Sequence, residues 1–505
     1  MRSKNAFINM GFGIVNQFVL LFTNVLIRKA MVNSLGIDYL GVNGLFSNIL
    51  ALLNLTESGF GVAISYRLYK PIADNDLERI KGLLRFYSTI YRWVAFIVLG
   101  VGVGLIPLLP TFINNTTIPQ SEIILYYFLY LTNSFVSYFV SYKISFLTAM
   151  QKGYYVSIIN SVMSIVFSAL KIYCLNGFDS YTIFLLLTII NTIFANGFVS
   201  IVSNNRYPYV KKMEDCKLSK GEKNEIFEDC KAVILHKVGA YVLTGTDNLV
   251  ISKFINLATV GLYSNYLMIL NVINSTLSKV VDSMIPAFGD IMATEGKDSL
   301  YEKYNFVEFI TFILTMFCSA MLVNLVQPCI SVLFGKEYLL DFDTILILIL
   351  NFYLGGMRRP ISAIKSACGI YQQDKYAAIL EAAINLIISI ILVKEIGLKG
   401  VFIGTIVSGV LMPNLVSPYY IYRDVFNRKF VGYIVKNIEY FAIYIFVTIL
   451  TYNVTSLINN VSSIRFFILK TMFSMVVCGC ACAIVAFLLP ERKYCFMMMK
   501  RIRRK

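Results

Sequence analysis

The sequence has few charged residues. Of its 505 residues, only 15% are charged and 57% are hydrophobic. A soluble globular protein carries roughly a quarter charged residues, so much of this surface must face something other than water. The longest polar stretch runs from Asn204 to Lys231, which is too short to fold as a separate soluble domain.

The residues of common catalytic sites are also scarce. The single histidine, His236, excludes a histidine-rich metal site and a catalytic triad. No G-x-x-x-x-G-K-[ST] loop is present, which excludes a P-loop ATPase. Cys478, Cys480 and Cys482 fan over about 200° of a helix, so they cannot converge on one metal ion. The sequence therefore predicts no enzyme, no metal site and no cofactor.

Long apolar runs make up most of the chain. A helix needs about 20 mostly apolar residues to span a bilayer. The sequence predicts an all-α polytopic membrane protein of about fourteen transmembrane helices. The first apolar run has no small-residue cleavage site, so we interpret it as a retained helix. The predicted spans are Phe7–Ile27, Tyr39–Ile64, Phe86–Pro110, Ile123–Thr148, Tyr155–Leu175, Tyr181–Val202, Ala232–Ile251, Thr259–Met284, Phe306–Val326, Thr344–Ile364, Tyr376–Val393, Val401–Tyr422, Ile434–Tyr452 and Phe466–Leu489.

The positive charge has a topological explanation. The net charge is +16, and the basic residues gather in alternate loops and in the C-terminal tail, which the positive-inside rule assigns to the cytoplasm. An even number of spans then places both termini there. The charge indicates attraction to anionic membrane lipids and no nucleic-acid partner. The outer loops are short, which argues against a glycosyltransferase or polymerase with an outer catalytic domain.

The chain contains a weak internal repeat. The segment Tyr39–Leu50 resembles Val260–Leu270, with Gly41 aligned to Gly261. The offset of about 220 residues corresponds to six helices, so the two copies are parallel, as in many transporters. This predicts two pseudo-symmetric six-helix lobes. The predicted parts are an N-lobe (1–203), a cytoplasmic linker loop (204–231), a C-lobe (232–430), an extra helix pair (431–490) and a basic cytoplasmic tail (491–505).

Several polar side chains lie within the predicted spans. Ionisable groups in hydrocarbon are costly and usually face a cavity or a partner. The alternatives are snorkelling to the interface for Arg28, Lys171 and Lys253, and helix-to-helix hydrogen bonds for the asparagines and threonines. The candidates for lining a central cavity are Arg28, Lys143, Lys237, Asn24, Glu57, Asp247 and Asn248, and those for its cytoplasmic entrance are Arg358, Arg359 and Lys365.

Three stretches carry a resemblance to a known family. They are TDNLVISKFI (Thr246–Ile255), VGLYSNY (Val260–Tyr266) and LGIDYLGV (Leu35–Val42). With the layout of the whole chain, they resemble the polysaccharide-biosynthesis transporters, which are flippases of lipid-linked oligosaccharides in the multidrug/oligosaccharidyl-lipid/polysaccharide exporter superfamily. The resemblance implies a V-shaped fold like that of multidrug and toxin extruders, with two additional C-terminal helices.

The resemblance also implies a function and a location. The expected substrate is an undecaprenyl-diphosphate-linked oligosaccharide, moved from the cytoplasmic to the outer leaflet of a bacterial inner membrane for O-antigen, capsule or exopolysaccharide assembly. Polysaccharide polymerase and glycosyltransferases are the implied partners. Cations in a wet cavity would lower the barrier for the diphosphate. Two alternatives remain: an ion-coupled small-molecule exporter, which should carry a net acidic cavity, and a non-transporting membrane scaffold.

Overall fold

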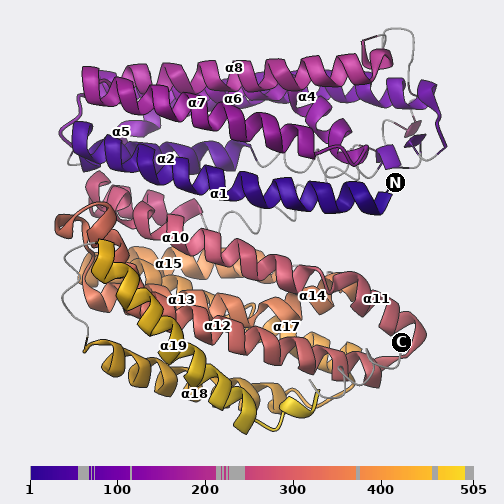
Figure 1. The fold of residues 1–505 in the computed structure, drawn as a ribbon, viewed down its shortest axis with the longest axis vertical. Coiled ribbons are helices and arrows are strands. Elements are labelled where there is room, and N and C mark those ends of the chain that lie inside the picture. The colour runs from indigo at the N-terminus through magenta and orange to yellow at the C-terminus, as the bar shows by residue number, and fades with distance from the viewer. Residues whose placement is uncertain are drawn as a thin grey trace. The chain divides into compact units, whose positions relative to one another are not determined.

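The computed structural model describes most of the chain as helices. It covers residues 2–54, 67–69, 71–72, 74–113, 116–211, 218, 221–222, 226, 245–370, 376–457 and 464–494. The chain forms two compact units, Met1–Gly261 and Leu262–Lys505 (Figure 1). The lobe boundaries expected from the sequence stay a prediction.

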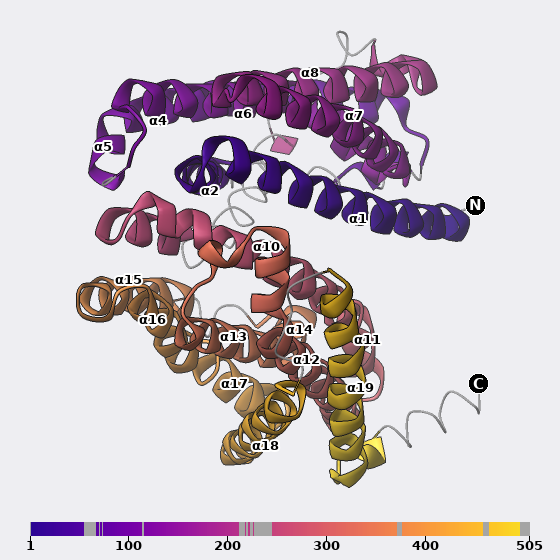
Figure 2. The same cartoon turned by 60° about the vertical axis from the view of Figure 1, so that its left-hand side comes forward.

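The first unit is a helical bundle. In Figures 1 and 2, α4, α6, α7 and α8 form a layer along which α1 and α2 lie. Its elements are α1 (Arg2–Leu35), α2 (Ile37–Leu53), α4 (Leu77–Leu105), η1 (Ile106–Leu108), α5 (Leu109–Phe112), α6 (Gln120–Ala149), α7 (Tyr154–Phe178), α8 (Tyr181–Arg206) and η2 (Pro208–Val210).

The second unit is built around one long helix, α12, which contacts α13, α18 and α19. Helix α10 begins in the first unit and continues into the second. The elements are α10 (Leu257–Asp282), α11 (Ile285–Thr294), α12 (Lys297–Leu333), η3 (Lys336–Tyr338), α13 (Phe342–Met357), α14 (Arg359–Cys368), α15 (Ala377–Ile396), α16 (Leu398–Leu411), α17 (Val416–Tyr420), η4 (Ile421–Val425), α18 (Val431–Thr455) and α19 (Ile464–Leu488).

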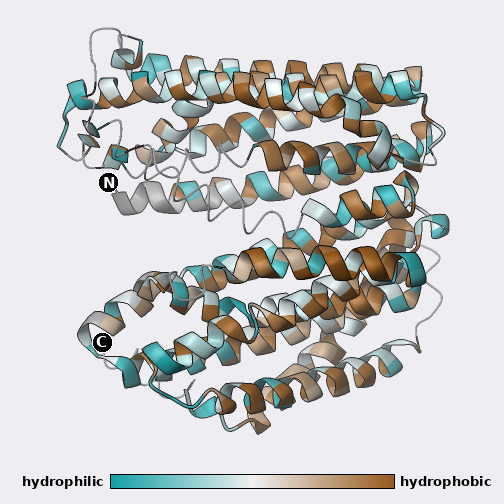
Figure 3. Ribbon diagram, turned by 180° about the vertical axis from the view of Figure 1, so that it is seen from behind, coloured by the Kyte–Doolittle hydropathy of each residue, from teal (hydrophilic) through white to brown (hydrophobic). Residues whose placement is uncertain are grey.

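The all-α membrane fold is confirmed. Ten stretches of the described helices are long and apolar enough to cross a bilayer. Figure 3 shows hydrophobic residues along the helices and many hydrophilic residues near their ends. Helix α2, at 17 residues, is a shorter apolar helix. The extra C-terminal pair predicted from the sequence is present as α18 and α19.

Two predicted spans are interrupted helices. The predicted tenth span is split into α13 and α14, with Pro360 just inside the start of α14. The predicted twelfth span is split into α16, α17 and η4, because Pro413 and Pro418 cannot continue a regular hydrogen-bond ladder. Proline removes a backbone donor and clashes with the preceding turn, so both breaks follow from the sequence.

A polar seam joins α1 to α7. Asn16 accepts a hydrogen bond from Ser161 (2.9 Å), and Thr23 and Ser164 share one (3.1 Å). Asn9, seven residues before Asn16, accepts from the backbone at the start of α7 (2.8 Å). Residue numbers rise together along both helices, so the pair is parallel. The seam accounts for one polar face of α1 and leaves another face for other contacts.

The two glycines aligned by the sequence repeat meet at one helix crossing within the first unit. A Cβ atom added at Gly261 would lie 2.7 Å from the carbonyl oxygen of Ile37 and 3.1 Å from the backbone nitrogen of Gly41. A Cβ atom at Gly41 would clash with the backbone of Leu257. Only glycine permits this approach between α2 and the first turn of α10.

A buried ion pair fixes α18 to α12. The Lys436 ammonium donates to Glu308 Oε2 (2.6 Å) and to Asn305 Oδ1 (2.8 Å). Tyr304 donates to the other oxygen of Glu308 (2.6 Å). Glu308 is 1% exposed, so both charges depend on these partners to offset their desolvation.

Candidate functional site

A network of hydrogen-bonded polar side chains lies next to Arg28 in the first unit. Tyr130 of α6 donates a hydrogen bond to Asn43 of α2, and its hydroxyl lies 3.0 Å from that of Tyr181 on α8. Arg28 of α1 interacts electrostatically with Tyr130. Four helices therefore contribute to one network, with a guanidinium at its edge.

Arg28 belongs to a second polar face of α1. Gln17, Asn24 and Arg28 are seven and four residues apart, so they follow one stripe of the helix. Gln17 and Asn24 are both exposed, whereas Asn16 and Thr23 face α7. Exposed polar side chains within an apolar span are costly in lipid, so this stripe suits a water-filled surface. The predicted candidates Asn24 and Arg28 are thus brought together.

Lys143 lies in a different environment. It is 8% exposed, and its ammonium donates to Ser200 Oγ (2.6 Å) and Asn204 Oδ1 (3.0 Å), both on α8. Beyond the end of α8, Tyr209 packs against Phe146, and burial raises the pKa of Tyr209 to about 12, so this phenol stays neutral. The two hydrogen bonds hold Lys143 between α6 and α8.

Arg358 and Arg359 occupy the break between α13 and α14. Arg358 pairs with Glu381 of α15 (3.3 Å). The Arg358 side chain is 38% exposed, whereas Glu381 is buried. The ion pair is therefore open to its surroundings on the arginine side, where a second anion could approach.

Arg359 has donor capacity to spare. Its Nη2 donates to Asn274 Oδ1 of α10 (2.5 Å), and Asp282 of the same helix acts on it electrostatically. Its Nη1 is buried and has no hydrogen-bond partner among the residues that the structure describes. A buried N–H without a partner is unusual. Arg359 thus presents a free guanidinium edge beside Arg358.

The other residues predicted to line the cavity or its entrance lie partly within and partly outside the described residues. Asp247 and Asn248 are buried in a helical segment at residues 245–254. Lys365 is partly buried on α14, two turns after Arg358. Lys237 and Glu57 lie outside the described residues. Arg358 and Arg359 are thus neighbours at one helix break, Lys365 lies two turns further along α14, and the entrance role of all three stays a prediction.

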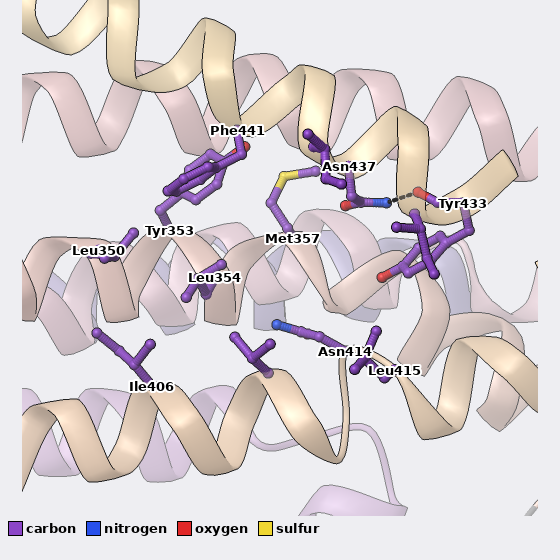
Figure 4. A pocket seen from close by; sticks show the side chains of 13 residues that line it. Leu350, Tyr353, Leu354, Met357, Ile406, Asn414, Leu415, Tyr433, Asn437 and Phe441 are labelled. Carbon is purple, nitrogen blue, oxygen red and sulfur yellow. Dashed lines mark hydrogen bonds between the residues drawn. The ribbon is translucent and has the colours of Figure 1, made fainter. Parts of the chain in front are cut away.

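An apolar pocket of about 370 Å³ lies between α13, α16 and α18. Figure 4 shows Leu350, Leu354 and Ile406 on its walls, and Asn437 donating to the backbone oxygen of Tyr433 (3.0 Å). None of its lining residues is charged. The pocket suits an apolar group and offers no cation for a phosphate.

Some residues of these clusters were not expected from the sequence. Glu381 stands in an apolar span, and this rare placement could have marked it. Asn274 and Tyr130 gave no such signal, because polar uncharged residues are common in helix interfaces. Their roles depend on contacts with residues 85 and 87 positions away in the chain.

The comparisons with known proteins place this architecture in a family. The sequence matches the family of polysaccharide biosynthesis proteins over residues 4–292. The chain belongs to that family. No curated protein matches this sequence.

Solved structures show the fold that this polysaccharide biosynthesis protein adopts. The lipid II flippase MurJ in an inward closed conformation is 16% identical, with a TM-score of 0.68 over 95% of this chain and 98% of that one. An inward-facing MATE multidrug transporter of the MOP superfamily is 15% identical, with a TM-score of 0.66 over 80% and 94%. The Vibrio cholerae MATE transporter VcmN is 13% identical, with a TM-score of 0.55 over 85% and 99%. The chain therefore has the fold shared by MurJ and the MATE transporters.

Proposed function

We propose that this membrane protein is a flippase for undecaprenyl-diphosphate-linked oligosaccharides. It moves the repeat unit from the cytoplasmic to the outer leaflet of a bacterial inner membrane, by alternating access through a cationic central cavity, and so supplies cell-surface polysaccharide assembly. The family match supports the pathway. The single observation that carries the proposal is the arginine pair at the α13–α14 break, where the buried Nη1 of Arg359 has no hydrogen-bond partner among the described residues.

The balance of charge supports an anionic substrate. Of the buried carboxylates Asp247, Glu308 and Glu381, the last two each form a salt bridge with a cation. Arg359 forms no salt bridge with any residue in the described ranges. An exporter of cations would instead need a carboxylate without a basic partner. A diphosphate can accept bidentate hydrogen bonds from a guanidinium, which are among the strongest in proteins.

The contacts divide the predicted cavity residues into two groups. We propose that Arg359 contacts the diphosphate and that Arg358 exchanges Glu381 for it, and that Arg28 of the first unit also acts on the substrate. Lys143 takes a structural role in place of the expected cavity role, because Ser200 and Asn204 hold its ammonium group. The membrane potential adds about 2.3 kcal/mol per 100 mV for each negative charge moved outward.

The basic loops and tail support a cytoplasmic location of both termini by the positive-inside rule. In that orientation α19 begins at the outer face. Glycosyltransferases that build the repeat unit and a polymerase that consumes it are the proposed partners.

Reconstituted proteoliposomes test the function. A fluorescent diphosphate-linked oligosaccharide lipid should move between leaflets with the wild-type protein, and Arg28→Gln should slow this movement about tenfold or more. Arg92→Gln, an exposed arginine of α4, is the matched control. Equal rates in all three proteins, or movement of cationic drugs without movement of the lipid, would favour the exporter alternative.

A further inference from the structure

Helix α19 carries a buried lysine, Lys470. Lys470 is 8% exposed, and no hydrogen bond or salt bridge reaches its ammonium from the described parts of the chain. One turn further, Ser474 is fully buried, and its hydroxyl also has no hydrogen-bond partner there. Positions four apart lie on the same helix face. Lys470 and Ser474 therefore lie on one buried face of α19, where the serine hydroxyl is buried without a hydrogen-bond partner among the described residues.

The polar groups further along this face of α19 are uncharged. The buried face of α19 packs on α12 and α18. Asn324 of α12 donates to Cys478 Sγ (3.8 Å) and accepts from Thr455 of α18 (2.6 Å). These amide, thiol and hydroxyl groups lie about two turns beyond Lys470 along α19 and carry no charge.

The same group of helices contains a second lysine, Lys436, whose charge is neutralised by a carboxylate. Nearer the other end of α18, Lys436 is held by Glu308 and Asn305. The Lys436 layer balances its charge internally, whereas among the described residues no anion pairs with Lys470. A desolvated cation without a counter-charge is strongly unfavourable, so a negative group from outside the chain would balance the charge of Lys470.

The position of Lys470 gives access from the lipid. It lies six residues after the start of α19, which is about 9 Å along the helix axis. Helical side chains lean toward the N-terminal end, so the ammonium is directed toward the interface rather than the bilayer centre. The neighbouring side chains of Phe466, Leu469 and Met472 are exposed and apolar, as expected for a helix surrounded by lipid.

We propose that Lys470 and Ser474 form a binding site for a phosphate group carried by a membrane lipid. The ammonium supplies the counter-charge and the serine hydroxyl donates a hydrogen bond to a phosphate oxygen. The acyl chains lie along the exposed apolar face of α19. The site depends on neither the proposed transport activity nor Arg359.

The test uses the purified full-length protein in phosphatidylcholine nanodiscs. Its Tm is measured after phosphatidylglycerol is included, after additional phosphatidylcholine, and after inorganic phosphate is added to the buffer. Phosphatidylglycerol should raise the Tm of the wild-type protein by about 2 °C or more through preferential binding to the folded state. Lys470→Met should abolish this increase, Ser474→Ala should reduce it, and Arg465→Gln, an exposed cation on the same helix, should retain it.

The outcomes separate the sources of the anion. An increase that is specific to phosphatidylglycerol and lost in Lys470→Met supports a lipid phosphate site. A Lys470-dependent increase with inorganic phosphate alone upholds the phosphate site but overturns a lipid as its source. An equal increase in wild type and Lys470→Met overturns the proposal, even if the variant is more stable because a buried charge has been removed.

Discussion

The C-terminal end of α6 and the break between α13 and α14 both place cations among apolar helices, but the contacts of these cations differ. Lys143 is buried and holds two hydrogen bonds to α8. Arg359 has one hydrogen bond to α10 and a buried Nη1 without a partner in the described structure. The comparison teaches that an intramembrane charge is not by itself a sign of a substrate site. We expect the hydrogen-bond donors of a cation that have no partner to be a better indicator of a substrate site than its charge.

The largest expected effect comes from turning a compensated lysine into an uncompensated one. Glu308→Gln removes the counter-charge of Lys436 in a buried ion pair, and we expect a loss of about 3–5 kcal/mol of stability. Thermal unfolding of the purified variant measures it. Lys436→Met added to Glu308→Gln should restore most of the stability, since no buried charge then remains. A double variant as unstable as the single one would refute this interpretation of the pair.

The next effect concerns the arginine with spare donors. Arg359→Lys keeps the positive charge but loses the planar fork that binds a phosphate at two points. We expect flipping to fall about tenfold or more, because one charge-assisted hydrogen bond is worth about 1.5–3 kcal/mol. The proteoliposome assay measures the rate at matched protein density. Wild-type flipping by Arg359→Lys would show that charge alone is sufficient there.

A smaller change in substrate binding is expected when Arg358 loses its salt bridge and so resembles Arg359. Glu381→Gln frees Arg358 from its salt bridge, so the diphosphate no longer competes with a carboxylate. We expect tighter substrate binding, by a few-fold, together with slower release. Binding isotherms and single-turnover flipping separate the two steps. Weaker binding in this variant would mean that Glu381 positions Arg358 rather than competing for it.

The smallest effect should come from the compensated site in the first unit. Ser200→Ala removes one of the two acceptors of Lys143, which should cost about 1–3 kcal/mol of stability. Flipping per folded molecule should remain unchanged. A specific loss of transport without a loss of stability would return Lys143 to the group of substrate-binding residues.

The sequence predicts the helices well for a physical reason. A bilayer span must be long, apolar and internally hydrogen-bonded, so apolar runs such as Ile123–Thr148 translate directly into helices such as α6 (Gln120–Ala149). The breaks were less visible. Pro360 could have marked the end of α13, but the apolar run continues through it, and the run was interpreted as one span.

The partners of the charges could not be predicted in the same way. Glu381 and Arg358 are 23 residues apart on different helices, and a hydrophobic pattern does not specify which helix faces meet. The sequence identified Arg28, Lys143 and Arg359 as polar groups in costly places, but only the contacts distinguish a lysine with two acceptors from an arginine with a free donor.

The most direct test is a comparison of substrate affinity in two variants, Arg359→Gln and Lys143→Gln. Both remove one intramembrane charge, and both are measured against a diphosphate-linked lipid in nanodiscs at equal amounts of folded protein. Our account predicts that Arg359→Gln weakens binding about tenfold or more, whereas Lys143→Gln binds as tightly as the wild type. Equal losses in the two variants, or a loss in Lys143→Gln alone, would contradict it.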